Sequence, residues 1–199
     1  MARRVFFSFH YERDIWRVNV VKNSWVTKGN YINAGFIDAA KFEDIKRQGD
    51  QAIKRWIDEQ LEGTSVTVVL IGAETYSRLW VRYEIIKSFD RGNGLLGIYI
   101  HNIEDSNGDK DIKGENPFEY VGVFIDKEGR AFYCERGFFK WFKSSLHSKC
   151  SRSFDKEYWT DNVYSFQDLL KVKLYDWVKN NGYENLADWI EEAARKAGR

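Results

Sequence analysis

Blocks of apolar and polar residues alternate along the first hundred positions and predict strands and helices in turn. Runs rich in β-branched and aromatic residues predict four strands, at 4–9, 34–38, 65–71 and 95–100. Apolar residues at helical spacing predict helices at 14–28, 53–61 and 77–89, the last of them capped by Ser77. The run at 65–71, SVTVVLI, is almost continuously apolar, as in a parallel strand covered on both faces.

This alternation favours an α/β fold with a mainly parallel sheet and right-handed crossovers. We expect a doubly wound, flavodoxin-like sheet of four to five strands in the order 2-1-3-4-5. Beyond residue 101 the pattern changes. Segments 120–125 and 130–134 flank Asp126-Lys127-Glu128-Gly129 and predict a hairpin, while 167–179 and 184–196 predict two helices. We expect one domain over 1–199, with a core at about 1–125 and a hairpin and helical extension at 126–199 packed on it.

Composition and charge exclude several classes of function. The chain has 31 Lys and Arg residues and 30 Asp and Glu residues, so its net charge does not indicate a nucleic-acid partner. The sequence offers no apolar run long enough to span a membrane and no extended signal region, which predicts a cytoplasmic protein. The two cysteines form no CxxC motif and the three histidines share no ligand spacing, so neither a metal nor a bound cofactor is expected.

The stretch 136–152 mixes basic and aromatic residues without an acidic residue. Such a mixture can bind single-stranded nucleic acid. A solvated basic face with its aromatic side chains packed inward explains it better, given the net charge of +1.

Ligands of open parallel sheets bind outside the carboxyl ends of the strands, near a reversal of strand order. Strand one ends at Ser8-Phe9-His10, which has neither the acidic pair of a phosphoacceptor domain nor a glycine-rich phosphate loop. Trp80 and Glu84 are four residues apart on one helical face, turned about 100° from the apolar stripe of that helix. We therefore expect Glu84 in a pocket at this end of the sheet.

These segments resemble a known family. Phe7-Ser8-Phe9-His10, Asp38 with its charged loop, and Trp80-Val81-Arg82-Tyr83-Glu84 are similar to the TIR domain, and most closely to the TIR-like ThsB proteins of the bacterial Thoeris antiphage system. The resemblance extends through the hairpin near Asp126 and the segments 175–178 and 181–183. Many catalytic TIR domains carry Trp-Cys-x-x-Glu in this helix, and here Val81 stands at the cysteine position.

The resemblance implies cleavage of NAD, as a substrate, at its nicotinamide–ribose bond, with Glu84 as the catalytic residue. It implies a cyclic ADP-ribose-type messenger that reaches a downstream effector, and it leaves homo-oligomers through TIR contacts open. Nicotinamide leaves as a neutral molecule, so one carboxylate that stabilises the cationic ribose is chemically sufficient. We expect the loop 39–48 to cover the site. The predicted substrate-binding residues are Ser8, His10, Asp38, Phe42 and Trp80.

Two other functions remain open from the sequence. One is a non-catalytic TIR interaction module, which has no need of the Glu84 carboxylate. The other is a nucleoside or nucleotide glycosyl-transfer enzyme in which Glu84 is a nucleophile and forms a covalent sugar intermediate. We further expect Glu84→Gln to leave folding unaffected, as for an exposed pocket residue.

Overall fold

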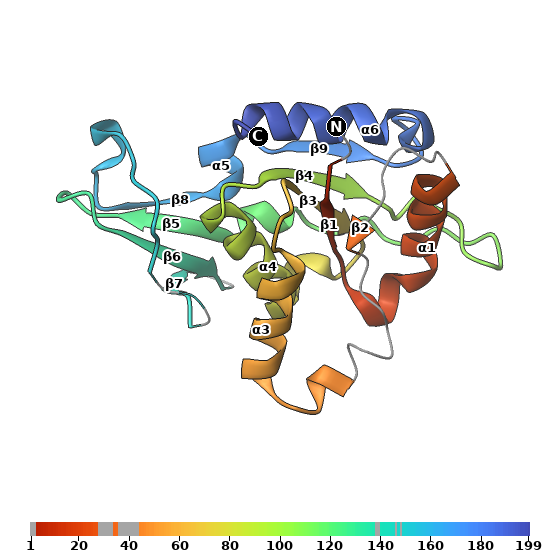
Figure 1. The fold of residues 1–199 in the computed structure, drawn as a ribbon, viewed down its shortest axis with the longest axis horizontal. Helices are drawn as coiled ribbons and strands as arrows, with labels where there is room; N and C mark the ends of the chain where they lie inside the picture. The colour runs from red at the N-terminus through yellow and green to blue at the C-terminus, as the bar shows by residue number, and fades with distance from the viewer. Residues whose placement is uncertain (1–2, 28–33, 36–43, 138–139, 146, 148) are drawn as a thin grey trace.

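Five parallel strands form the central sheet, in the order β2-β1-β3-β4-β9 (Figure 1). The computed structural model describes residues 3–27, 34–35, 44–137, 140–145, 147 and 149–199. The strands are β1 (Val5–Ser8), β2 (Ala34–Gly35), β3 (Val66–Ile71), β4 (Gly94–Tyr99) and β9 (Lys173–Asp176). This confirms the predicted flavodoxin-like α/β fold and its order 2-1-3-4-5.

The register of β1 on β3 determines which side chains meet at the functional end of the sheet. Val5 pairs with Val66 and Ser8 pairs with Val69. Ser8 is the last residue of β1, whereas β3 continues to Ile71. Any element that follows β3 can therefore fold back over the end of β1.

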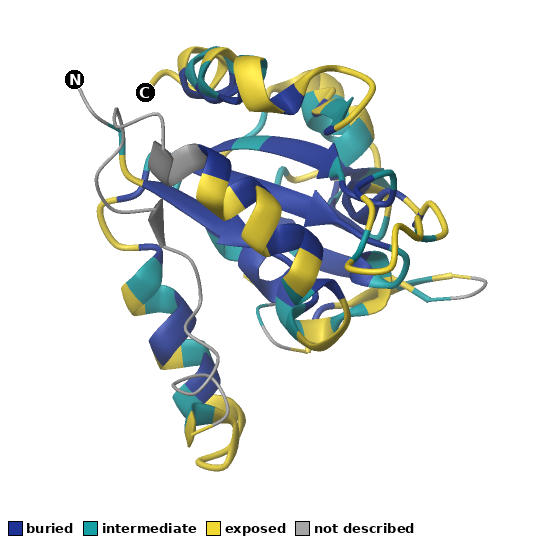
Figure 2. Cartoon of the chain, turned by 90° about the vertical axis from the view of Figure 1, so that its right-hand side faces the viewer, coloured by how far each residue is buried: buried dark blue, intermediate teal, exposed yellow. Residues whose placement is uncertain are grey.

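Strand β3 is buried on both faces, as its continuous apolar sequence predicts. Val66, Val68 and Leu70 belong to one core cluster, with Val18 of α1 (Tyr11–Thr27) and Ile190 of α6 (Gly182–Lys196). In Figure 2 the strands at the centre of the parallel sheet are mostly buried, while a covering helix presents one buried and one exposed face. The period of two along the strand thus divides its side chains between two cores.

The opposite face of β3 packs on α4 (Leu79–Asp90). Val69 and Ile71 share a second core cluster with Ile85 and Phe89 of this helix. Beside α4 lies α3 (Asp50–Gln60), which extends away from the sheet in Figure 1. The Tyr83 hydroxyl on α4 donates to the Asp58 carboxylate on α3, at 3.2 and 3.3 Å to its two oxygens.

The second half of the chain adds an antiparallel sheet of order β7-β6-β5-β8. Strands β5 (Val121–Ile125) and β6 (Ala131–Arg136) form the predicted hairpin around Asp126. Strands β7 (Trp141–Lys143) and β8 (Asn162–Ser165) flank it. Val121, Val123 and Tyr133 of the hairpin belong to the same core cluster as α4, so this sheet packs on the α4 side of the molecule. The short helices are η1 (Thr75–Ser77), η2 (Pro117–Glu119), η3 (Lys156–Tyr158) and α5 (Phe166–Leu170).

The predicted helix at 167–179 is wrong. Only α5 is helical there, and β9 follows it and pairs with β4 from Leu96↔Lys173 to Tyr99↔Asp176. The expected core boundary near residue 125 therefore does not describe the central sheet, because its fifth strand and α6 come from the last thirty residues. The prediction that Ser77 caps the helix at 77–89 is also wrong. Arg78 is the N-cap of α4, and the Ser77 hydroxyl donates to the Glu74 carbonyl instead.

The basic and aromatic stretch is only partly as expected. Phe142 on β7 is half-exposed, so its ring is not packed inward, and the Lys140 ammonium lies 5.1 Å from the ring centroid. Phe138 and Phe139 lie outside the described residues. Cys134 and Cys150 are buried free thiols. None of the helices in the described ranges is both long enough and apolar enough to cross a membrane.

The contact of β4 with α6 gives a test of the fold. A Cβ at Gly94 would lie 2.4 Å from the Ala193 backbone carbonyl oxygen, and backbone cannot move aside as a side chain can. We expect Gly94→Ala to lower stability by about 1–3 kcal/mol, the usual effect of overpacking, and the melting temperature by about 2–4 °C per kcal/mol. Thermal unfolding followed by circular dichroism measures this. In Gly108→Ala nothing lies within 4 Å of the added Cβ, so its cost comes from the positive φ of 84° alone and is about 1–2 kcal/mol. A loss below about 1 kcal/mol in Gly94→Ala would contradict the prediction.

Candidate active site

The carboxyl group of Glu84 lies at the end of β1, beneath a cleft. Glu84 is in the second turn of α4, and only 2 % of its surface is exposed. The Ser8 hydroxyl, itself fully buried, donates a hydrogen bond of 2.5 Å to Glu84 Oε2. The two residues are 76 positions apart in sequence and meet because α4 crosses the end of β1.

This environment changes the acidity of Glu84. Burial raises the pKa of the carboxyl group from 4.5 to about 8, and the hydrogen bond from Ser8 offsets only part of that shift. In the free protein the carboxyl group is therefore mostly protonated at neutral pH. The expectation that Glu84 is an exposed pocket residue is wrong. The face of α4 that carries Glu84 is turned away from the apolar stripe of this helix, but it packs against β1 and is buried there.

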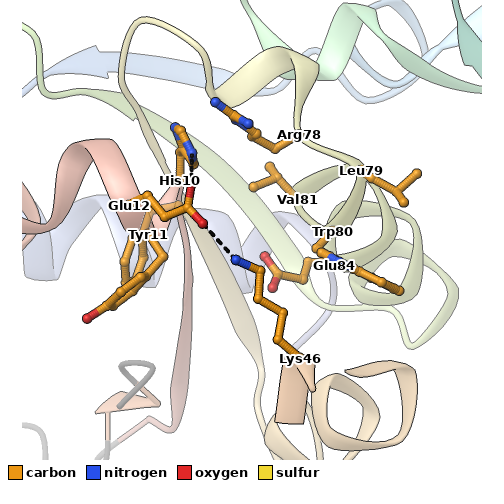
Figure 3. Close-up of a pocket in the computed structure, with 10 residues that line it drawn as sticks. His10, Tyr11, Glu12, Lys46, Arg78, Leu79, Trp80, Val81 and Glu84 are labelled. Carbon is orange, nitrogen blue, oxygen red and sulfur yellow. Dashed lines mark hydrogen bonds and ion pairs between the residues drawn. The ribbon is translucent and has the colours of Figure 1, made fainter. Parts of the chain in front are cut away.

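A cleft of about 240 Å³ opens above this carboxyl group. Figure 3 shows Trp80 and Glu84 from α4 on one side, His10 and Glu12 from the start of α1 on the other, and Lys46 reaching in from the turn at 44–46. Its volume is below the roughly 300–1,000 Å³ of typical small-molecule sites, so it suits one half of a dinucleotide better than a whole one. The described residues that line it are Phe9, His10, Tyr11, Glu12, Lys46, Arg78, Leu79, Trp80, Val81 and Glu84.

Trp80 forms one wall, held by its neighbours. Its ring meets Tyr83 edge to face, with the centroids 6.1 Å apart, and Leu79 beside it is 43 % exposed. On the opposite side, burial lowers the pKa of His10, and the nearby Arg78 guanidinium lowers it further. His10 is therefore neutral at pH 7. Its Nδ1 is buried and has no hydrogen-bond partner among the described residues.

Ion pairs surround the mouth of the cleft. Lys46 Nζ lies 2.7 Å from Glu12 Oε1, and this pair lowers the pKa of Glu12. His10 Nε2 lies 4.0 Å from the same carboxylate. Arg78 pairs with Glu74, which the guanidinium of Arg13 also contacts at 3.3 Å.

The structure brings four of the predicted site residues together. His10, Trp80 and Glu84 line the cleft, and Ser8 lies beneath it, bound to Glu84. Asp38 and Phe42 lie outside the described residues, as does the first half of the loop expected to cover the site, residues 39–43. The part of that loop that is described contributes Lys46 to the lining.

Several cleft residues escaped the sequence analysis. Tyr11 and Glu12 directly follow the end of β1, so the rule that located His10 would also have found them. Arg78 lies two positions before Trp80, at the start of the helix that carries the motif. Lys46 lies in the loop 39–48 that was expected to cover the site, but no motif distinguished it from the other residues of that loop.

Two comparisons with known proteins cover this chain. Residues 6–105 match the family described as "Thoeris protein ThsB, TIR-like domain". The match includes all of α4 and the end of β1. This chain belongs to the Thoeris ThsB family of TIR-like proteins. It is also 42 % identical over 194 residues to a Bacillus cereus (strain MSX-D12) protein named "Putative cyclic ADP-D-ribose synthase ThsB1", covering 96 % of this chain and 100 % of that protein.

The site departs from the general TIR pattern at one lining position. Val81, where many catalytic TIR domains have cysteine, lines the cleft beside Trp80 and also belongs to the α4 core cluster. The substitution keeps this wall apolar and removes a thiol from it. Among the described residues, no three His, Cys, Asp or Glu side chains are grouped to hold a metal ion.

The raised pKa of Glu84 predicts a pH-dependent effect on stability. In the unfolded chain this carboxyl group ionises near 4.5, whereas in the folded protein it ionises near 8. Folding therefore favours the protonated form, and stability falls as the pH rises from about 4.5 to about 8. Glu84→Gln removes that loss. This amounts to about 4 kcal/mol between pH 5 and pH 9, so we expect its melting temperature relative to the parent protein to rise by about 8–16 °C over this range.

The measurement is thermal unfolding of both proteins across this pH range. Glu62→Gln is the matched control, because Glu62 is exposed just beyond α3 and has no part in the cleft. A difference between Glu84→Gln and the parent that stays constant with pH would contradict the raised pKa.

Proposed function

We propose that this protein is an NAD-cleaving enzyme that breaks the nicotinamide–ribose bond and makes a cyclic ADP-ribose-type messenger in antiviral defence signalling. The observation that carries the proposal is the buried carboxyl group of Glu84 at the floor of the cleft, at the carboxyl end of the parallel sheet. The name of the 42 % identical relative, as a cyclic ADP-D-ribose synthase, supports the product class.

The reaction needs little acid catalysis. When the bond between ribose C1 and the pyridinium nitrogen breaks, its electron pair stays with nicotinamide, which leaves neutral. The positive charge passes to the ribose as an oxocarbenium-like centre. A carboxylate beneath that centre lowers the transition-state energy, and in a site that excludes water its effect is larger. A nucleophilic group of the same molecule then donates an electron pair to C1 and closes the ring. If that group is a hydroxyl, its proton passes to the Glu84 carboxylate, which then returns to its neutral form.

The protonated state of Glu84 in the free protein fits this sequence of events. NAD brings a pyridinium cation into the cleft, and a nearby positive charge favours the carboxylate form. The hydrogen bond from Ser8 also favours the carboxylate. NAD binding therefore helps to ionise Glu84. In the empty site Glu84 stays protonated, so no unpaired charge is buried.

The other proposed roles follow from position. Trp80 presents an aromatic wall for the nicotinamide or ribose, and Ser8 positions the Glu84 carboxyl group from below. His10, neutral and with a free ring nitrogen among the described residues, is suited to hydrogen-bond substrate. Asp38 and Phe42 are proposed to bind substrate on the family resemblance alone.

The wider signalling role rests on the family. The messenger would diffuse to a downstream effector, and the enzyme would require no bound cofactor. Its cytoplasmic location and its assembly into homo-oligomers remain predictions.

Glu84→Gln tests the enzyme assignment. The substitution keeps the size of the side chain but removes the negative charge, so the loss should fall on the transition state more than on NAD binding. We expect nicotinamide release to fall by about 10²–10³-fold, the usual effect of losing one such electrostatic contact. Nicotinamide and cyclic product are measured by mass spectrometry at high NAD and protein concentrations, with an infection-derived lysate supplied.

Glu62→Gln should keep full activity. Full activity in Glu84→Gln would refute the catalytic role of Glu84, whereas absence of nicotinamide release from the parent protein would refute the enzyme assignment and favour the interaction-module hypothesis. A covalent sugar adduct on Glu84, sought by intact-protein mass spectrometry, would instead favour the glycosyl-transfer hypothesis, since the electrostatic role requires none.

The activity should also depend on pH. Because catalysis needs the ionised carboxylate, kcat/KM should rise with pH and level off above the free-enzyme pKa of about 8. The profile of kcat should level off at lower pH, because bound NAD favours the carboxylate. Ser8→Ala removes a hydrogen bond that lowers the pKa of Glu84, so it should move the kcat/KM profile to higher pH. A profile that stays in place in Ser8→Ala would exclude Glu84 as the titrating group.

A further inference from the structure

Two basic side chains line the cleft that holds Glu84, and the proposed bond cleavage gives neither a role. Arg78 is the N-cap residue of α4, and Lys46 comes from the turn before α3. Glu84 itself is mostly protonated in the free protein. Among the described residues, the other charged side chains that line the cleft are these two cations and the Glu12 carboxylate.

Both cations have partners that an anionic ligand can replace. Lys46 pairs with Glu12, whose side chain is 62 % exposed, and Arg78 pairs with Glu74, which is 44 % exposed. Exposed ion pairs of this kind contribute little to stability, because water screens them. A phosphate group offers more acceptor oxygens and a larger negative charge. Glu74 keeps Arg13 as a partner if Arg78 turns to a ligand, so that exchange strands no carboxylate.

Arg78 also has an unused donor. Its Nε is buried, and no described residue accepts a hydrogen bond from it. A buried donor without an acceptor is unfavourable. Glu74 therefore satisfies only part of the hydrogen-bonding capacity of the guanidinium. An oxygen atom of a ligand in the cleft would accept the remaining hydrogen bond from Nε after the side chain rotates.

The amino end of α4 contributes to the same side of the cleft. Arg78, Leu79, Trp80 and Val81 all line it. The first turn of α4 has no acidic residue, and the Arg78 side chain makes no capping hydrogen bond. The backbone N–H groups at a helix start have no partner within the helix and attract anions. Here they lie beside a basic side chain, and the neighbouring His10 is more than nine-tenths buried with an unpartnered ring nitrogen.

We propose that Arg78 and Lys46, with the amino end of α4, form a subsite for the pyrophosphate of a dinucleotide whose ribose lies over Glu84. This inference rests on the proposed function for the identity of the ligand. The phosphate of NAD is attached to the same ribose that loses nicotinamide, so a site that holds that sugar against Glu84 also holds its phosphate near the rim. The small cleft accommodates the nicotinamide riboside half of NAD. The subsite binds the pyrophosphate at the edge of the cleft, where the rest of the dinucleotide extends out of it.

The subsite also serves selectivity. Nicotinamide riboside has the reacting bond but no phosphate, and it would gain nothing from Arg78 or Lys46. ADP-ribose has the pyrophosphate but no nicotinamide. The two ligands therefore separate binding at the subsite from binding at the floor of the cleft.

The test is direct binding by calorimetry, with ADP-ribose and nicotinamide riboside as probes and no turnover required. The variants are Arg78→Gln and Lys46→Gln, and Arg47→Gln is the matched control, because Arg47 adjoins Lys46 but is 80 % exposed and outside the cleft. Loss of a charged hydrogen bond predicts ADP-ribose binding about 10–100-fold weaker in Arg78→Gln and about 10-fold weaker in Lys46→Gln. Nicotinamide riboside binding should change by less than about 3-fold, as should ADP-ribose binding by Arg47→Gln.

Three results would overturn the subsite. They are unchanged ADP-ribose affinity in Arg78→Gln, equal losses for both probes, and failure of the parent protein to bind ADP-ribose at millimolar concentration. Melting temperatures of all variants show whether a loss comes from misfolding, and the more conservative Arg78→Lys should then keep intermediate affinity. An inactive parent protein that still shows the predicted probe selectivity would refute the proposed catalysis while supporting the subsite.

Discussion

The burial of one ionisable group, Glu84, is the constraint on which the site depends. A carboxyl group that is 2 % exposed is stable in the folded protein mainly as the neutral acid, and the Ser8 hydroxyl is its hydrogen-bond donor within the protein. The contact requires α4 to cross the end of β1 at hydrogen-bond distance. That crossing is fixed by the parallel pairing of β1 with β3 and by the packing of Ile85 and Phe89 against the second core cluster. Much of the fold therefore serves to hold one poorly solvated acid in place.

The two-sided burial of β3 explains how a small sheet supports this placement. One set of alternating side chains packs on α1 and α6, and the other packs on α4 and the antiparallel sheet. Because α4 is held between β3 and that second sheet, it has little freedom to move Glu84 away from Ser8. The residues after 117 thus do more than extend the chain. They cover the outer side of the helix that carries the catalytic candidate, and they supply the fifth strand of the central sheet.

The parts of the fold that sequence alone could predict are those with long apolar runs. The run at 65–71 identified a doubly covered parallel strand, and the alternation of strands and helices located the first four strands of the order that the flavodoxin-like fold predicts. Strand β9 was missed because it is a four-residue edge strand in a stretch whose apolar residues also suit a helix. Strands β7 and β8 are equally short, and their pairing with β6 and β5 depends on tertiary contacts.

For the candidate site, sequence located Ser8, His10, Trp80 and Glu84 because each lies at a strand end or on one helical face. It misjudged the burial of Glu84, since helical periodicity gives the direction of a side chain but not what packs on that side. Sequence did not identify Lys46 and Arg78 as residues of the site, because neither lies at a strand end or on the helical face that carries Glu84. These two residues and their ion-pair partners Glu12 and Glu74 form the rim of the cleft.

The floor and the rim of the cleft are held by different kinds of interaction, and this difference suits a reaction that must admit a charged dinucleotide and then exclude water. The floor is rigid, because Ser8 and Glu84 lie in a strand and a helix that are both buried in the core. The rim is held by exposed ion pairs, which are weak and exchange readily. An anionic ligand can therefore replace the rim contacts without disturbing the floor. A buried rim would resist entry, and an exposed floor would keep Glu84 ionised and hydrated, which would weaken its hold on the positive charge of the ribose.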